Sequence, residues 1–138
     1  MTTNEFVVRQ IRDTGNQVRK SLFDLPEEHW NARINDQAMS PAETLAHLTE
    51  CLLAFQASTE GREHAWGSYA PSDTGPQGLM NAWEAERGKV LEMAESLSEE
   101  HLGHASDFVA LHDAYHVGQL CNLRLLLNPE WNAYAIYE

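Results

Sequence analysis

Apolar residues recur at intervals of three and four along four segments of this chain, and no other feature constrains its fold as strongly. This spacing places the apolar side chains on one face of an α-helix. No segment alternates between apolar and polar residues for long enough to form a strand. We therefore expect an all-α fold, and 138 residues suffice for a single domain, residues 1–138, that buries its own core.

The first two predicted helices begin at capping boxes. Thr2 precedes Glu5 by three residues, and Ser40 precedes Glu43 by the same interval. In this motif the hydroxyl and the carboxylate each accept a hydrogen bond from the other residue's backbone N–H. The predicted apolar stripes that follow are Val7, Ile11, Val18, Leu22 and Leu25 in the first helix, and Leu45, Leu48, Leu52 and Phe55 in the second.

The remaining two helices are separated from the first pair by a long connection. Thr74, followed by Pro76, predicts the start of the third helix. A fourth helix is expected from about Ser106 to Asn128, where an Asn-Pro sequence ends it. The connection "TEGREHAWGSYAPSDTG" before the third helix is long enough to cross the bundle. The expected architecture is a four-helix bundle with a long crossover between helices 2 and 3.

The net charge argues against several classes of partner, and the cysteines indicate a reducing compartment. Nine Lys and Arg residues against 21 Asp and Glu residues give a formal charge of −12, and the cations form no basic stripe of the kind that binds nucleic acid. We expect neither nucleic-acid nor membrane partners. The chain shows no signal-peptide or membrane-spanning pattern. Cys51 and Cys121 lie within helical patterns, which suits reduced thiols in a cytoplasmic protein.

Two histidines four residues apart interrupt the apolar face of the fourth helix, in the sequence "HDAYHVGQL". His112 and His116 fall on the stripe that should face the core. Side chains at this spacing stack over one another, so both rings can reach one ion. His47 lies beside the apolar stripe of the second helix. Three imidazoles from two facing helices would form a metal site with one open position, as in catalytic zinc centres; a hydrogen-bonded polar core is the alternative.

Two other classes of metalloprotein do not match the spacing. A ferritin-like di-iron bundle needs Glu-x-x-His on two helices, and the chain contains no such sequence. A zincin peptidase needs His-Glu-x-x-His, but here Asp113 follows His112, and its shorter side chain should point away from a metal. We therefore expect neither a di-iron centre nor a peptidase.

Four residues near the histidines could support the site. Gln119, three residues after His116, could orient that ring, or it could cap the polar edge of the core. Glu43 and Glu50 each lie one turn from the histidine of the second helix and could accept a hydrogen bond from a ligand imidazole, although solvated carboxylates are more common there. Cys51 could be a fourth ligand or a redox partner, although a small buried thiol is the more common role.

The segments "SPAETLAHL" and "HDAYHVGQL" resemble the DinB-like superfamily of metal-binding helical bundles. In that superfamily one histidine of the second helix and a His-x-x-x-His pair on the last helix bind a divalent metal, commonly nickel or zinc. The resemblance implies that His47, His112 and His116 are the ligands. It also implies that the long second connection crosses the bundle and that the protein forms a homodimer.

The resemblance implies a class of reaction as well. Related proteins include thiol S-transferases that use bacillithiol or mycothiol, and a mycothiol-dependent maleylpyruvate isomerase. The first hypothesis is therefore a metal-dependent enzyme, a thiol S-transferase or a hydrolase, acting on a small electrophilic molecule with a low-molecular-weight thiol as a further cofactor. The metal would lower the pKa of a bound water or thiol. The alternative is a noncatalytic bundle that binds a metal or ligand without turnover.

Overall fold

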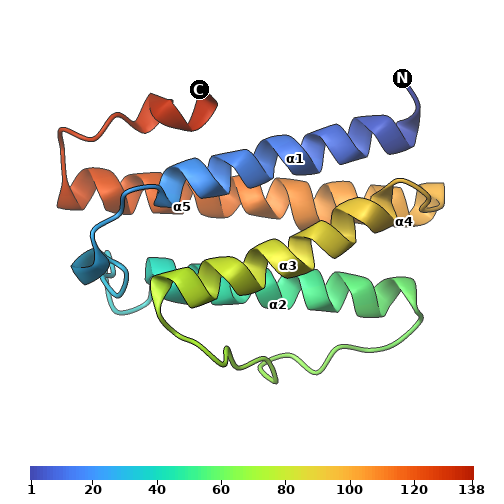
Figure 1. Cartoon of the computed structure of the whole chain (residues 1–138), viewed down its shortest axis with the longest axis horizontal. Coiled ribbons are helices and arrows are strands. Elements are labelled where there is room, and N and C mark those ends of the chain that lie inside the picture. Colours follow the sequence, from blue (N-terminus) through green and yellow to red (C-terminus); the bar gives the residue numbers. More distant parts are fainter.

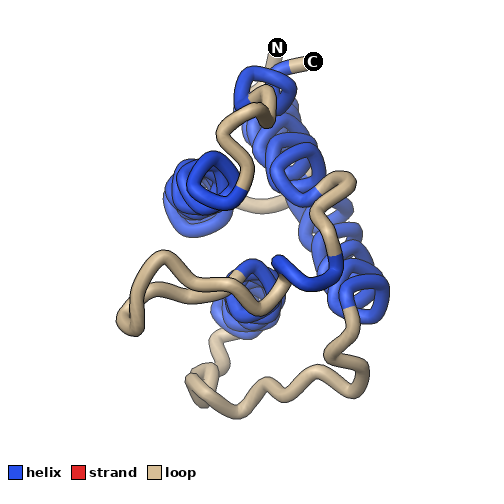
Figure 2. The backbone as a smooth tube through the Cα atoms, turned by 90° about the vertical axis from the view of Figure 1, so that its left-hand side faces the viewer, coloured by secondary structure: helices blue, strands red, loops and turns tan.

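The computed structural model describes residues 1–138, and it contains helices and loops but no strand (Figure 2). The expected all-α class is confirmed. None of the helices combines the length and the apolar character needed to cross a membrane. The elements are α1 Thr3–Leu22, η1 Glu27–His29, α2 Pro41–Thr59, α3 Pro76–Ala94, α4 Glu99–His104, η2 Ala105–Leu111, α5 His112–Leu127 and η3 Ala133–Tyr137.

The long helices pack side by side as a bundle. The α2 helix packs against α3, whereas α1 packs against α5 and η2. Figure 1 shows α2 and α3 running in the same direction, with α1 and α5 running opposite to them. A helix of 19 residues is about 28 Å long, so parallel neighbours need a long connection. Residues 60–75 return along the outside of the pair (green in Figure 1).

Capping boxes begin α1 and α2, as predicted. The side chains of Thr2 and Ser40 accept from the third helical residue, and both reciprocal bonds are present. The prediction of Thr74 as the cap of α3 is wrong, because Gly75 occupies that position. The backbone N–H of Gly75 donates to Oδ1 of Asp73 at 2.9 Å. An aspartate that bonds two residues ahead forms its own turn, and here that turn precedes the helix.

The last helix begins earlier than the sequence indicated. It was expected from about Ser106, but the chain is already helical from Glu99 and continues through α4, η2 and α5 to Leu127. Acidic residues in the first turn suit the positive end of a helix, and Leu102 is buried there. The segment η2 is a π-helix, a local widening that is frequent at functional sites. It directly precedes α5.

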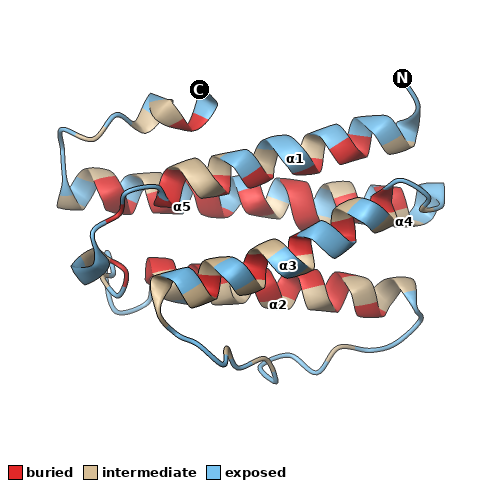
Figure 3. Cartoon of the chain, viewed as in Figure 1, coloured by how far each residue is buried: buried red, intermediate tan, exposed pale blue.

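The core lies between the inward faces of the helices (red in Figure 3). Every residue of the two predicted stripes is buried, namely Val7, Ile11, Val18, Leu22, Leu25, Leu45, Leu48, Leu52 and Phe55. Trp83 of α3 is also fully buried. The three-and-four spacing therefore identified the faces that pack together.

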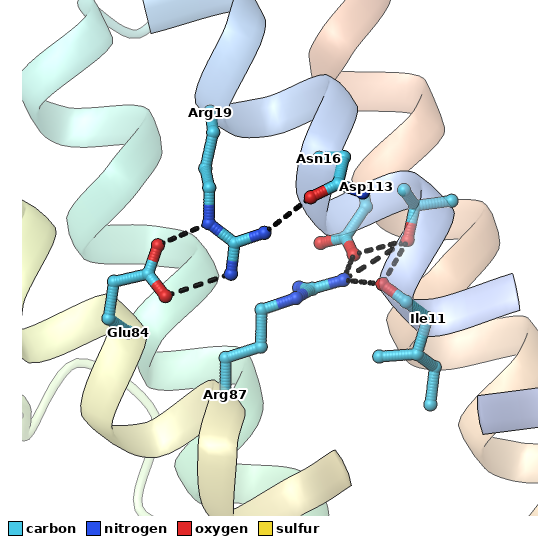
Figure 4. Close-up of polar contacts among 7 residues, drawn as sticks. Ile11, Asn16, Arg19, Glu84, Arg87 and Asp113 are labelled. Carbon is cyan, nitrogen blue, oxygen red and sulfur yellow. Dashed lines mark hydrogen bonds and ion pairs between the residues drawn. The ribbon is translucent and has the colours of Figure 1, made fainter. Parts of the chain in front are cut away.

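One ion pair lies inside this core and joins three helices (Figure 4). Nη2 of Arg87 on α3 lies 2.8 Å from Oδ2 of Asp113 on α5, and the two side chains are only 1% and 4% exposed. The same nitrogen donates to the backbone oxygen of Ile11 on α1, and the Thr14 hydroxyl donates to Asp113 at 2.9 Å. Removing one member would leave an uncompensated buried charge, which is strongly destabilising. The guanidinium also lies over the Trp83 ring, 4.9 Å from its centroid.

Gly15 makes room for this arginine. A Cβ atom at that position would lie 2.3 Å from Nε of Arg87. The arginine cannot move aside freely because its guanidinium is held by Asp113. The backbone of α1 therefore approaches the ion pair through the one residue type that lacks a side chain.

We expect Gly15→Ala to lower the free energy of unfolding by about 1–3 kcal/mol, the usual effect of overfilling a packed core. Urea denaturation measures this change. Gly88→Ala is the matched control, since an added Cβ there meets nothing within 4 Å, and alanine should stabilise that helix by up to about 1 kcal/mol. Equal effects of the two substitutions would contradict a fixed Arg87 side chain.

Candidate metal centre

Three histidines meet where α2 packs against the last helix. His47 lies on α2, and His112 and His116 lie on the first two turns of α5. The centroid of the His47 ring is 5.1 Å from that of His112 and 5.0 Å from that of His116. The two rings on α5 are 4.5 Å apart. The fold thus brings together all three histidines that the sequence selected.

The ring nitrogens have the separations expected of ligands around one ion. Nε2 of His112 lies 3.3 Å from Nε2 of His47 and 2.9 Å from Nε2 of His116. Two imidazole nitrogens that each bind one zinc ion at about 2.0–2.1 Å, with an angle of about 90–110° between them, lie about 2.9–3.4 Å apart. Both observed distances fall in this range, so the Nε2 atom of His112 lies at ligand spacing from each of the other two rings.

Gln119 fixes the orientation of the His116 ring. Nδ1 of His116 lies 2.7 Å from Oε1 of Gln119, whose Nε2 donates to the hydroxyl of Tyr115 at 3.1 Å. An amide oxygen can only accept, so Nδ1 of His116 carries the hydrogen. Nε2 then keeps its lone pair and faces the other two rings. This is the tautomer that a metal ligand requires, and its outer partner is of the kind that orients ligand histidines.

Burial makes all three imidazoles weaker bases. The pKa of His116 is lowered to about 4, first by burial and then by the charge that His112 would carry. Burial is also the main cause that lowers the pKa of His47 and of His112 below 6.5. At neutral pH the three rings are therefore neutral. Neutral rings offer lone pairs, which metal binding requires.

Cys51 belongs to the same cluster. Its Sγ lies 3.6 Å from Nε2 of His47, one turn earlier on α2. The ligand atoms of His47, Cys51 and His112 all lie within 4.8 Å of one another, so this group could hold a metal ion. Burial raises the pKa of the thiol to about 12. The sequence favoured a plain buried thiol, but the structure places the sulfur among the histidines.

The carboxylates of Glu43 and Glu50 on α2 have hydrogen-bond partners outside the cluster. Oε1 of Glu50 lies 3.0 Å from Nε2 of His64 and accepts from the backbone N–H of Gly67 at 2.7 Å. Glu43 accepts two hydrogen bonds from Arg33, each at 2.8 Å. The hydrogen bonds of Glu43 and Glu50 thus go to Arg33, His64 and Gly67 rather than to a cluster imidazole, although the charge of Glu50 still acts on His47 and raises its pKa against the larger effect of burial. The long connection folds back and supplies Glu50 with other donors, which tie this loop to α2.

An aromatic stack leads along the last helix to His112. The rings of His104, Phe108 and His112 follow one another on successive turns, with centroid distances of 5.1 and 5.9 Å and interplanar angles of 10° and 19°. Nδ1 of His112 is buried without a hydrogen-bond partner. Such a group costs about 1–3 kcal/mol.

A helical bundle with a histidine cluster between two of its helices is the class of protein that the fold and the site define. The family model described as DinB superfamily matches residues 10–122. The chain therefore belongs to the DinB superfamily. The matched range includes His47, His112 and His116. Searches among curated proteins and among solved structures found no match.

We expect the metal-free protein to lose stability as the pH falls from about 7 toward 4. The unfolded His116 ring takes up a proton near its ordinary pKa of 6.5, whereas the folded ring does so only near about 4. Between these values the unfolded state binds more protons, so the free energy of unfolding falls with decreasing pH.

Urea denaturation of chelator-treated protein at several pH values measures this dependence. His116→Gln should make the dependence shallower, and His29→Gln, which changes a histidine far from the cluster in sequence, should leave it as in the wild type. An unchanged pH dependence in His116→Gln would contradict the effect of burial on this ring.

Proposed function

We propose that the protein binds one divalent metal ion, nickel or zinc, through His47, His112 and His116. The observation that carries this proposal is the approach of the three rings from two helices, with Nε2 separations of 3.3 and 2.9 Å. The tautomer of His116 that Gln119 imposes supports it further. Three imidazole ligands with an open fourth position are typical of catalytic rather than structural zinc.

We extend the proposal to a metal-dependent enzyme, a thiol S-transferase or a hydrolase, that acts on a small electrophilic molecule. A bound divalent ion supplies a Lewis acid, which lowers the pKa of a thiol or water toward neutrality. The protein's own residues would keep the rings neutral and oriented, and the apolar surroundings would strengthen electrostatic interactions at the site. Gln119 also lines a small, mostly apolar cavity together with Thr44 and Leu120, and none of the three histidines lines it.

The second candidate is a noncatalytic bundle that holds a metal without turnover. The position of Cys51 favours it, because a fourth protein ligand would close the coordination of the ion, as in structural zinc sites. The two candidates share the metal and differ in whether the loaded protein consumes a substrate.

Elemental analysis of untagged protein tests the metal proposal. We expect about one metal ion per chain, as a single three-histidine site requires, and none in the His47→Ala/His112→Ala/His116→Ala variant. The variant should keep its helical circular dichroism spectrum, because the apolar stripes remain. His29→Ala is the control and should retain the metal.

Two results would contradict this proposal. One is wild-type metal content in the triple variant, and the other is no metal in the wild type after incubation with nickel and zinc. The enzyme proposal is tested by incubating the metal-loaded protein with a low-molecular-weight thiol and a small electrophile and measuring how fast both are consumed. Loss that depends on the metal and is absent in the triple variant supports an enzyme, whereas a loaded but inert protein favours the noncatalytic bundle.

A further inference from the structure

We infer that Cys51 supplies a fourth ligand, a thiolate, to the same ion, so that the centre has three imidazole nitrogens and one sulfur. This inference rests on the proposed metal site. It changes the chemistry of that site, because the fourth position is then filled by the protein in the resting state.

The position of Cys51 on α2 permits this. Residues four apart on a helix lie on the same face, so Cys51 faces the cluster as His47 does. The Sγ atom lies 3.6 Å from Nε2 of His47. In a tetrahedral zinc site with Zn–N of about 2.0–2.1 Å and Zn–S of about 2.3 Å, a nitrogen and a sulfur ligand lie about 3.6 Å apart. The observed distance therefore matches a shared ion.

His112 on α5, the other helix of the site, also lies near Cys51. The ligand atoms of Cys51 and His112 lie within 4.8 Å of each other, as do those of each with His47. Cys51 is 4% exposed, and His47 Nε2 is the polar partner of its sulfur. The sulfur thus lies beside one ligand nitrogen from each helix, those of His47 and His112. The other cysteine, Cys121, lines a separate groove with the C-terminal Tyr134 and Tyr137.

Binding through sulfur has a defined proton balance. The S–H bond of Cys51 breaks, the metal–sulfur bond forms, and the proton leaves to solvent, with no change in oxidation state. A donor set of three imidazoles and one thiolate in tetrahedral geometry suits zinc.

Cobalt(II) titration of the metal-free protein tests the inference, because cobalt reports sulfur ligation by absorbance without any need for activity. The wild type should bind about one cobalt ion, as a single site requires, and show a near-ultraviolet sulfur-to-cobalt charge-transfer band. Cys51→Ser should bind cobalt without this band, with a dissociation constant raised about tenfold or more, since even the outer partners of ligands change affinity by that factor. Cys121→Ser is the matched control and should keep the band and the affinity.

The possible results distinguish the sulfur ligand from the proposed metal site on which it rests. Cobalt bound by the wild type without the band overturns the sulfur ligand and leaves the three-histidine site standing. A band that persists in Cys51→Ser also overturns it. No bound cobalt in the wild type overturns both the sulfur ligand and the metal site. Since a band that persists in Cys121→Ser can come only from the other cysteine, the test does not depend on whether Cys51→Ser folds.

Discussion

The buried pair of Arg87 and Asp113 is the interaction on which the arrangement of the helices depends. Neither charge is stable alone in an apolar interior, so Arg87 of α3 and Asp113 of α5 can be buried only because they meet. Their bonds to Ile11 and Thr14 add α1 to the same junction. Hydrophobic packing tolerates small shifts of one helix along another, but a buried ion pair has one good register. It therefore links α5 to α1, which packs against it, and to α3, from which Arg87 reaches across.

That register matters for the candidate metal centre because Asp113 directly follows His112. The aspartate points toward α1 and α3, and the histidines of the same helix meet His47 of α2. The α5 helix thus places a carboxylate against Arg87 on one side and carries two imidazoles on the other. The π-helical segment η2 directly precedes His112. Gln119 fixes the orientation of the His116 ring. The centre is built on rigid helices, as a defined ligand geometry requires.

The sequence predicted the helical class, the buried stripes and the three histidines, because periodicity and spacing along one helix translate directly into faces. It could not predict contacts between distant segments. His64 lies in a loop whose return path is not encoded in any local pattern, so its contact with Glu50 was missed. The residue type of Cys51 predicts a buried thiol, and it is buried, but no local pattern predicts that its sulfur lies beside His47. Arg87 was overlooked although it lies between Trp83 and Val90 at three-and-four spacing, a signal that could have revealed a buried charge in need of a partner.

X-ray diffraction at the absorption edge of the bound metal tests the central claim most directly. The account predicts one anomalous scattering peak per chain, within bonding distance of Nε2 of His47, His112 and His116. A peak located elsewhere, or three rings joined only by hydrogen bonds in crystals of metal-loaded protein, would contradict it.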